Sequence, residues 1–120
     1  MSQPNSNHSD LHRLYTVLEE FKKISPTMPV QQILAFLSVA MHEGTSLKEL
    51  VEVSKTKTPT MSRHLIDLGP RNRRMEPGYK LIECRQDPME LRKNQYTLSE
   101  RGRFLINNIA QKMNHHGDLR

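Results

Sequence analysis

The chain has 120 residues, one cysteine and a formal net charge of +5. A chain of this length suits one domain with a single modest core, and one cysteine excludes an internal disulfide and fits a reducing compartment. No apolar run is long enough to span a membrane, and the polar first ten residues lack the apolar stretch of a signal peptide, so we expect no membrane partner.

A first helix is predicted over residues 10–23, after a polar segment of residues 1–9 that we expect to be a disordered tail. Leucines and aromatic residues recur at helical spacing along this helix, Asp10 can supply its N-cap, and Pro26 prevents its continuation. An apolar stripe of this kind serves either the core or a subunit interface.

A second helix is predicted over residues 28–42, with Thr27 as its cap and Gly44 beyond its end. Apolar side chains occupy much of its circumference, which is typical of a helix in the middle of a core. We therefore expect this helix to be central.

Residues 46–68 predict two short helices joined by a tight turn. Ser46 and Glu49 have the spacing of a capping box, which starts the first helix. Thr58 can cap the second helix with its hydroxyl, and Pro59 suits the first helical position. One face of the second helix should be buried through Met61, Leu65 and Leu68. Such a pair is typical of a helix-turn-helix, whose second helix enters the DNA major groove; a helical hairpin within a core is the alternative.

Residues 69–78 contain glycines and prolines that break a helix, and this loop is basic. Two strands are predicted after it, at residues 79–85 and 94–98, and Asp87-Pro88 supplies a turn signal between them. A basic β-hairpin directly after a helix-turn-helix indicates the wing of a winged-helix domain.

The last predicted helix begins after Ser99, a good N-cap, with Glu100 in its first turn. Residues 114–120 should be a frayed tail. The predicted fold is therefore mainly α with a small β-hairpin (α+β), a winged helix-turn-helix in the order α-α-α-α-β-β-α. Residues 10–113 should form one domain with dimerisation helices at both ends.

The positive charge is concentrated between residues 54 and 93. This segment holds ten cations and five anions, whereas the remainder of the chain holds eight of each sign. A basic segment on a neutral scaffold is typical of proteins that bind polyanions, although a basic surface alone more often serves solubility.

Four segments carry the motifs of a winged-helix family: residues 28–37 (MPVQQILAFL), 60–65 (TMSRHL), 85–92 (RQDPMELR) and 98–103 (LSERGR). They are similar, in turn, to a second helix containing Pro and Gln, a recognition-helix core, a wing, and the start of the helix after the wing. In this order and spacing they resemble the transcription regulators of the multiple-antibiotic-resistance (MarR) type. The loop of residues 69–78 departs from that family, because it is longer and more basic than the usual connection.

The fold and the resemblance together lead us to expect a homodimer that binds double-stranded DNA. The residues expected at the major groove are Thr58, Thr60, Ser62, Arg63 and His64, and those expected at the DNA backbone are Lys55, Lys57, Arg71, Arg73 and Arg74. The wing residues are Arg85, Asp87, Arg92 and Lys93. Arg63 can donate two hydrogen bonds to guanine or bind a phosphate, and both roles stay open. Arg92 would probe the minor groove, and the resemblance implies that Asp87 orients it.

The expected dimer interface comprises Leu11, Leu14, Leu18, Phe104, Leu105 and Ile109. We expect no cofactor, no metal site and no enzymatic activity, since the sequence lacks phosphate-binding, nucleophile and metal-ligand motifs. Cys84 should be an inert, half-buried strand residue, and nothing in the residues supports a small-molecule effector.

The predicted function is therefore sequence-specific DNA binding by a MarR-like transcriptional regulator in the cytoplasm, associated with the nucleoid. A phage or plasmid protein that acts in replication or partition is the nearest alternative. A winged-helix protein-interaction module is the more distant one, because such modules usually lose the cations that this chain retains.

Overall fold

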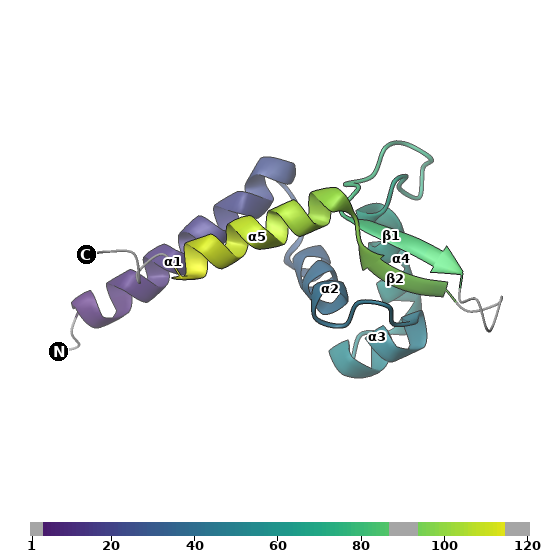
Figure 1. Cartoon of the computed structure of the whole chain (residues 1–120), viewed down its shortest axis with the longest axis horizontal. Helices are drawn as coiled ribbons and strands as arrows, with labels where there is room; N and C mark the ends of the chain where they lie inside the picture. Colours follow the sequence, from purple (N-terminus) through teal and green to yellow (C-terminus); the bar gives the residue numbers. More distant parts are fainter. Residues whose placement is uncertain (1–3, 87–93, 115–120) are drawn as a thin grey trace. The chain divides into compact units, whose positions relative to one another are not determined.

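The computed structural model describes residues 4–86 and 94–114 (Figure 1). The elements are α1 (Pro4–Ile24), α2 (Val30–Met41), α3 (Leu47–Ser54), α4 (Thr58–Leu68), β1 (Ile82–Gln86), β2 (Asn94–Leu98) and α5 (Glu100–Asn114). Four helices, a two-stranded hairpin and a fifth helix follow one another as predicted. The chain groups into two compact units, Pro29–Arg103 and Met1–Met28 with Phe104–Arg120. The single domain of residues 10–113 stays a prediction.

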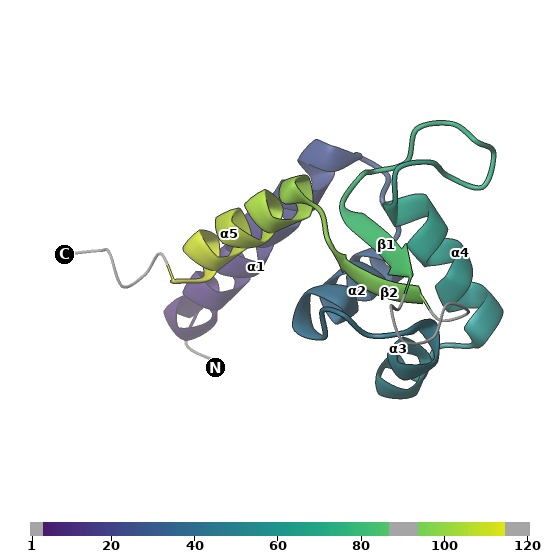
Figure 2. The same ribbon diagram turned by 45° about the vertical axis from the view of Figure 1, so that its right-hand side comes forward.

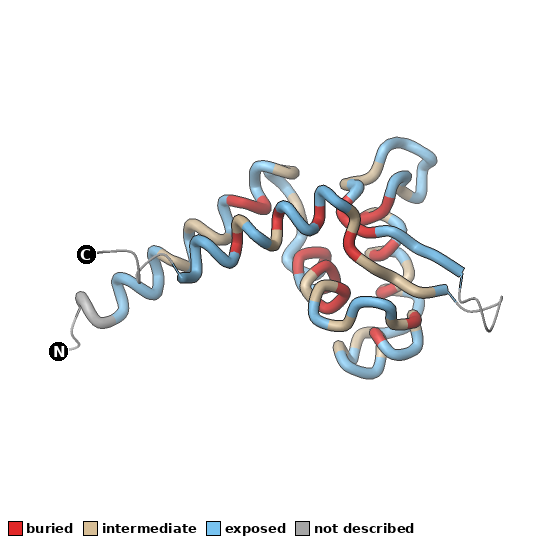
Figure 3. The backbone as a smooth tube through the Cα atoms, in the orientation of Figure 1, coloured by how far each residue is buried: buried red, intermediate tan, exposed pale blue. Residues whose placement is uncertain are grey.

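The core of the unit Pro29–Arg103 lies among α2, α3, α4 and the base of the hairpin. Its fully or almost fully buried apolar side chains are Ala35, Phe36, Val39, Leu50, Met61, Leu65, Leu68, Leu81, Ile82 and Leu98. α2 contributes several of them, which confirms that this apolar helix is central. The buried positions recur at helical spacing along α4, at residues 61, 65 and 68, and along α5, at residues 102, 105 and 109 (Figure 3).

α1 begins at Pro4, six residues before the predicted start. Asp10 therefore lies inside the helix and is not its N-cap; its carboxylate is 3.5 Å from Arg13 Nη1, one helical turn away. Proline is well tolerated in the first turn of a helix, and no glycine or proline occurs between Pro4 and Asp10 to interrupt it. Residues 4–9 thus belong to the helix rather than to a tail.

α2 begins at Val30, two residues later than predicted, and its N-cap is Pro29 rather than Thr27. Proline disfavours helical backbone at the residue before it, so Met28 cannot join the helix. The chain leaves α2 through Gly44, whose positive φ of 85° suits a residue without a side chain.

The helix-turn-helix pair starts with the predicted capping box. Ser46 Oγ accepts a hydrogen bond from Glu49 N (3.3 Å), and Glu49 Oε1 accepts one from Ser46 N (2.9 Å). Lys55 turns the chain toward α4 with a left-handed backbone (φ 58°). The N-cap of α4 is Lys57, not Thr58, because Lys57 O already accepts the helical bond from Met61 N.

The hairpin begins three residues later than predicted. Tyr79, Lys80 and Leu81 do not pair with β2; their amides donate instead to carbonyls of residues 67–69 at the end of α4. Helix C-termini leave carbonyls without partners, and this segment supplies the missing donors. β1 and β2 then pair antiparallel from Ile82 opposite Leu98 to Gln86 opposite Asn94.

Ser99 caps α5, as predicted. Its Oγ accepts a hydrogen bond from Gly102 N (3.0 Å) and donates one to Lys80 O (2.7 Å). A Cβ at position 102 would collide with Leu81 O, so only glycine allows the first turn of α5 to lie against the residue that precedes β1. The Ser-Glu-Arg-Gly motif therefore fixes where α5 meets the hairpin.

Glu43 ties three segments of this unit together. Its carboxylate accepts hydrogen bonds from both terminal nitrogens of Arg103 (2.9 and 2.8 Å) and from Leu98 N (2.9 Å). The turn after α2, the end of β2 and the start of α5 are thereby joined. The Arg103 hydrogen bonds, followed by the Leu98 amide, lower the pKa of Glu43 below its ordinary value.

This arrangement predicts a pH-dependent contribution to stability. Since the pKa of Glu43 is depressed in the folded state, its contribution is present above the ordinary value of 4.5 and is lost as the pH falls through the folded value. In Glu43→Gln, the free energy of unfolding should fall less steeply with pH in this acid range than in the parent protein. Urea titrations at successive pH values measure both curves.

The matched control is Glu52→Gln, which removes an exposed carboxylate on α3. It should leave the pH dependence of the parent protein unchanged. Equal acid slopes for Glu43→Gln and the parent protein would contradict the proposed contribution of Glu43.

Candidate nucleic-acid interface

α4 has one buried and one outward face, as its sequence predicts. Met61, Leu65 and Leu68 are at most 3% exposed and hold the helix against the core. Thr58 and Arg63 are exposed, whereas Thr60 and Ser62 are half-buried. Because three buried anchors fix the rotation of the helix, Arg63 is the cation that its outward face presents.

Two grooves flank α4. A groove of about 330 Å³ between α2 and α4 has a mostly apolar lining and includes Thr60 and His64. A groove of about 580 Å³ on the other side is lined by Ser62 together with Cys84 and other hairpin residues. Thr60 and Ser62 thus border different grooves, and Arg63 directly follows Ser62 in the sequence.

His64 is less available than the sequence suggested. Its Nε2 is buried and has no hydrogen-bond partner among the described residues. Burial lowers the pKa of His64, an effect that Asp67 opposes and Arg73 reinforces. His64 lines the α2–α4 groove, and its place at the major groove stays a prediction.

Lys55 and Lys57 are both exposed at the turn between α3 and α4. They lie at the N-terminal end of α4, where unpaired backbone amides add a partial positive charge. The turn is fastened by Lys55 N donating to Val51 O (2.8 Å) and by Thr56 N donating to Ser54 Oγ (3.3 Å). This end of the helix is therefore cationic and well ordered.

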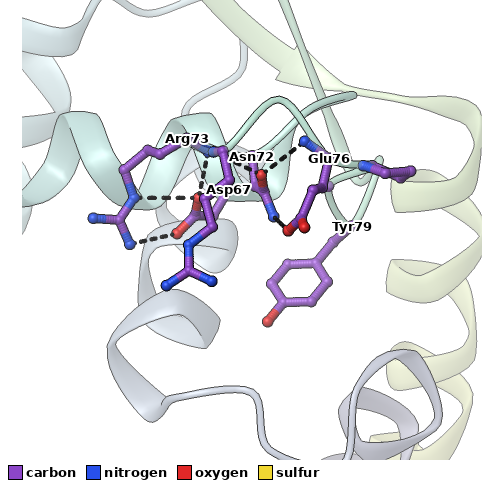
Figure 4. A pocket seen from close by; sticks show the side chains of 8 residues that line it. Asp67, Asn72, Arg73, Glu76 and Tyr79 are labelled. Carbon is purple, nitrogen blue, oxygen red and sulfur yellow. Dashed lines mark hydrogen bonds and ion pairs between the residues drawn. The ribbon is translucent and has the colours of Figure 1, made fainter.

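The three arginines predicted at the DNA backbone follow α4 in the loop of residues 69–78. Arg71, Arg73 and Arg74 are all exposed, but only Arg73 forms an ion pair among the described residues, with Nη2 3.0 Å from Asp67 Oδ2. A pocket of about 370 Å³ opens beside this pair. Figure 4 shows Asp67, Asn72, Glu76 and Tyr79 around it.

Asp67 is the residue whose role the sequence did not reveal. On α4 it falls on the outward side, where a carboxylate is normally a solvated charge. In the structure its side chain is only 13% exposed and also accepts a hydrogen bond from Gln32 Nε2 of α2 (3.2 Å). The one available signal is its position four residues before Arg71, the first of the three loop arginines, which favours ion pairing without identifying the partner.

The hairpin projects beyond the core. Only Ile82 is buried in β1, and the strand is exposed from Glu83 to Gln86 (Figure 3). Cys84 is therefore exposed rather than half-buried as expected, because no described residue covers this end of the strand. Arg85 is exposed and lies 3.4 Å from Glu83. The other predicted wing residues, Asp87, Arg92 and Lys93, lie outside the described residues.

In the unit that contains α1, this helix and the part of α5 from Phe104 onward lie side by side (Figures 1 and 2). Four of the predicted interface residues, Leu11, Leu14, Leu18 and Phe104, are exposed by 43–67%. Leu105 and Ile109 are already buried within the chain, so they are not available to a second copy. The exposed apolar stripe lies mainly on α1.

Among the described residues, no helix is long and apolar enough to cross a membrane. In the same part of the chain, no three His, Cys, Asp or Glu side chains are grouped so that they could hold a metal ion.

Comparison with known proteins identifies the fold. No protein-family model and no curated protein sequence matches the chain. Among solved structures, it is similar to MarR (22% identity, TM-score 0.61), with 92% of this chain and 72% of that chain covered. It is also similar to S. aureus MepR in a DNA complex, at 18% identity and a TM-score of 0.67, with 92% of this chain and 81% of that chain covered. A third similar structure is RV1404 from Mycobacterium tuberculosis, at 14% identity and a TM-score of 0.68, with 95% of this chain and 73% of that chain covered. The chain therefore has the winged helix-turn-helix fold of the MarR-type regulators, as its sequence motifs indicated.

Proposed function

We propose that this protein is a MarR-like transcriptional regulator that binds double-stranded DNA sequence-specifically as a homodimer. The observation that carries the proposal is the outward face of α4. Arg63 is exposed there while Met61, Leu65 and Leu68 fix the helix from behind. The similar structure of MepR was determined in a complex with DNA. We propose neither a catalytic role nor a cofactor, and we place the protein in the cytoplasm, at the nucleoid.

In the proposed complex α4 lies in the major groove. Arg63 donates two parallel hydrogen bonds to O6 and N7 of a guanine, which is the contact that best distinguishes this base. The hydroxyls of Thr58, Thr60 and Ser62 contact nearby base edges or phosphates. His64 packs in the groove beside α2 and contributes shape rather than a hydrogen bond from Nε2.

The hairpin serves as the wing at the minor groove. Arg85 is exposed near the end of β1, and the segment that follows it contains Asp87, Arg92 and Lys93. Arginine is attracted to a narrow minor groove, because the negative potential is strongest there. Arg92 would make this contact, with Asp87 as its ion-pair partner.

A dimer follows from the size of the reading surface. One recognition helix contacts only a few base pairs, so two copies are needed for useful specificity. The exposed stripe of Leu11, Leu14 and Leu18, with Phe104, supplies apolar area for this contact. Burying such side chains between copies is favourable by about 25 cal/mol for each Å² removed from water.

The first prediction of this proposal concerns base reading by Arg63. Arg63→Ala should weaken binding to the preferred duplex by about 1–3 kcal/mol and binding to scrambled DNA much less, because a bidentate base contact is lost. Arg63→Lys should show a similar loss of discrimination, since an ammonium cannot form the planar double contact. Fluorescence anisotropy at one salt concentration gives the ratio of the affinities for the preferred and the scrambled duplex, for the parent protein and for each variant.

Lys57→Ala is the control for a phosphate contact and should weaken both complexes by the same factor. If Arg63→Ala also weakens both complexes equally, Arg63 binds a phosphate, and base reading must come from Thr60 and its neighbours.

The second prediction concerns assembly. Sedimentation velocity at micromolar concentration should give about twice the chain mass of 14.0 kDa. The double substitution Leu11→Glu and Leu18→Glu should give a folded monomer, because it places charge in the proposed interface at two exposed positions. Val53→Glu, at an apolar position on α3 that is 50% exposed, is the matched control and should stay dimeric.

Circular dichroism should show the same helix content in all of these proteins. A parent chain that is monomeric at every concentration, with or without DNA, would rule out the homodimer.

A further inference from the structure

The loop between α4 and β1 is fastened by its own hydrogen bonds. Asn72 Oδ1 accepts from the amides of Arg74 (2.9 Å) and Glu76 (3.1 Å), and Asn72 N donates to Glu76 O (2.7 Å). Arg71 Nη1 adds a bond to Met75 O (3.2 Å). The five residues at the tip, 72–76, are thus held in one conformation.

The base of the loop is also fixed. Gly78 N donates to Pro70 O (2.9 Å), and Arg71 and Pro77 form an isolated β-bridge. A Cβ at Gly78 would collide with Gly69 O, so the two sides of the loop approach more closely than any other residue would allow. A segment ordered in advance loses little further conformational entropy when it binds a partner, which favours a role in recognition.

Two neighbouring arginines at the tip have different surroundings. Arg73 donates to Asp67 from Nε (3.4 Å), from Nη2 (3.0 Å) and from its backbone amide (3.3 Å). Asp67 is held in turn by Gln32 Nε2. The guanidinium of Arg74 has no ion-pair or hydrogen-bond partner among the described residues, although Arg74 lines the same pocket.

Because their surroundings differ, Arg73 and Arg74 differ in how readily they can bind a phosphate. Asp67 compensates the charge of Arg73 and occupies Nε and Nη2 of its guanidinium, which lowers the attraction of Arg73 for a phosphate. Arg71 donates one hydrogen bond from Nη1 to a carbonyl of the loop, which restrains its side chain without compensating its charge. Of the three loop arginines, Arg74 carries the guanidinium that has no partner among the described residues and can bind an external anion, and its backbone amide is already fixed by Asn72.

The position of the loop next to α4 indicates which anion Arg74 would bind. α4 has 11 residues and is therefore about 16 Å long at about 1.5 Å per residue, somewhat more than the width of a DNA major groove of about 12 Å. A helix of this length, placed across the groove, would reach from one phosphate strand to the other. Lys55 and Lys57 flank its N-terminal end, and the loop follows its C-terminal end directly.

We propose that the loop of residues 69–78 is a phosphate-binding finger, in which Arg74 contacts the DNA backbone at the C-terminal end of α4. Arg73 and Asp67 are positioning residues that hold the finger and do not contact DNA. This inference rests on the proposed DNA binding and revises the expectation that all three loop arginines act alike. The finger and the two lysines would contact opposite edges of the major groove.

The test compares single alanine variants of these two neighbouring arginines. For each variant of the full chain that folds, the affinity for the preferred duplex is measured over a range of salt concentrations. Arg74→Ala should make the slope of log K against log[salt] less negative by about 0.9 for each bound chain, because one phosphate contact is lost. Arg74→Lys should restore the slope. Arg73→Ala should leave the slope unchanged but accelerate hydrogen exchange of the amides of Arg74 and Glu76.

Arg101→Ala, which removes an exposed arginine from α5, is the control for total charge and should not alter the slope. An unchanged slope in Arg74→Ala would overturn the finger, as would a slope that changes in Arg73→Ala but not in Arg74→Ala. Both outcomes leave the proposed DNA binding intact, provided that the parent protein prefers one duplex. If the parent protein binds no duplex at all, the proposed function itself fails.

Discussion

The burial of one side of α4 against the core is the constraint on which the surface chemistry depends. Met61, Leu65 and Leu68 are spaced so that each of them faces inward, and together they leave the helix no freedom to rotate. Arg63 must then point outward. A shorter or less regular buried stripe would leave the orientation of Arg63 undetermined, and a helix without a fixed face could not read bases.

Neighbouring segments of the chain form hydrogen bonds at both ends of this helix. At its start, a left-handed Lys55 and a fastened turn bring two lysines beside the first backbone amides. At its end, the amides of residues 79–81 take up the last carbonyls and lead the chain into the hairpin. The carboxylate of Glu43 then joins the hairpin to α5, because it accepts hydrogen bonds from Leu98 N and from Arg103. The backbone positions that carry the cations around α4 are therefore fixed by hydrogen bonds at both ends of the helix.

Local sequence patterns predicted the parts of the fold that depend on local physics. The buried stripe of α4, the capping box at Ser46 and the cap at Ser99 are all set by residues within one or two helical turns. The predicted cap at Thr58 was wrong, because Lys57 O already accepts a helical hydrogen bond from Met61 N. The predicted start of β1 was wrong, because the amides of residues 79–81 donate to carbonyls at the end of α4 and do not pair with β2. The pairing of Arg73 with Asp67 depends on how a ten-residue loop folds back, which no periodicity encodes.

The central claim is that the outward face of α4 reads DNA sequence. Selection of bound sites from fragmented genomic DNA with the purified protein, read by sequencing, tests it most directly. The account predicts one enriched pseudo-palindrome whose half-sites lie about one helical turn apart, as the two-fold axis of a dimer requires. Recovery of DNA without any enriched motif, or of no DNA above background, would contradict the claim.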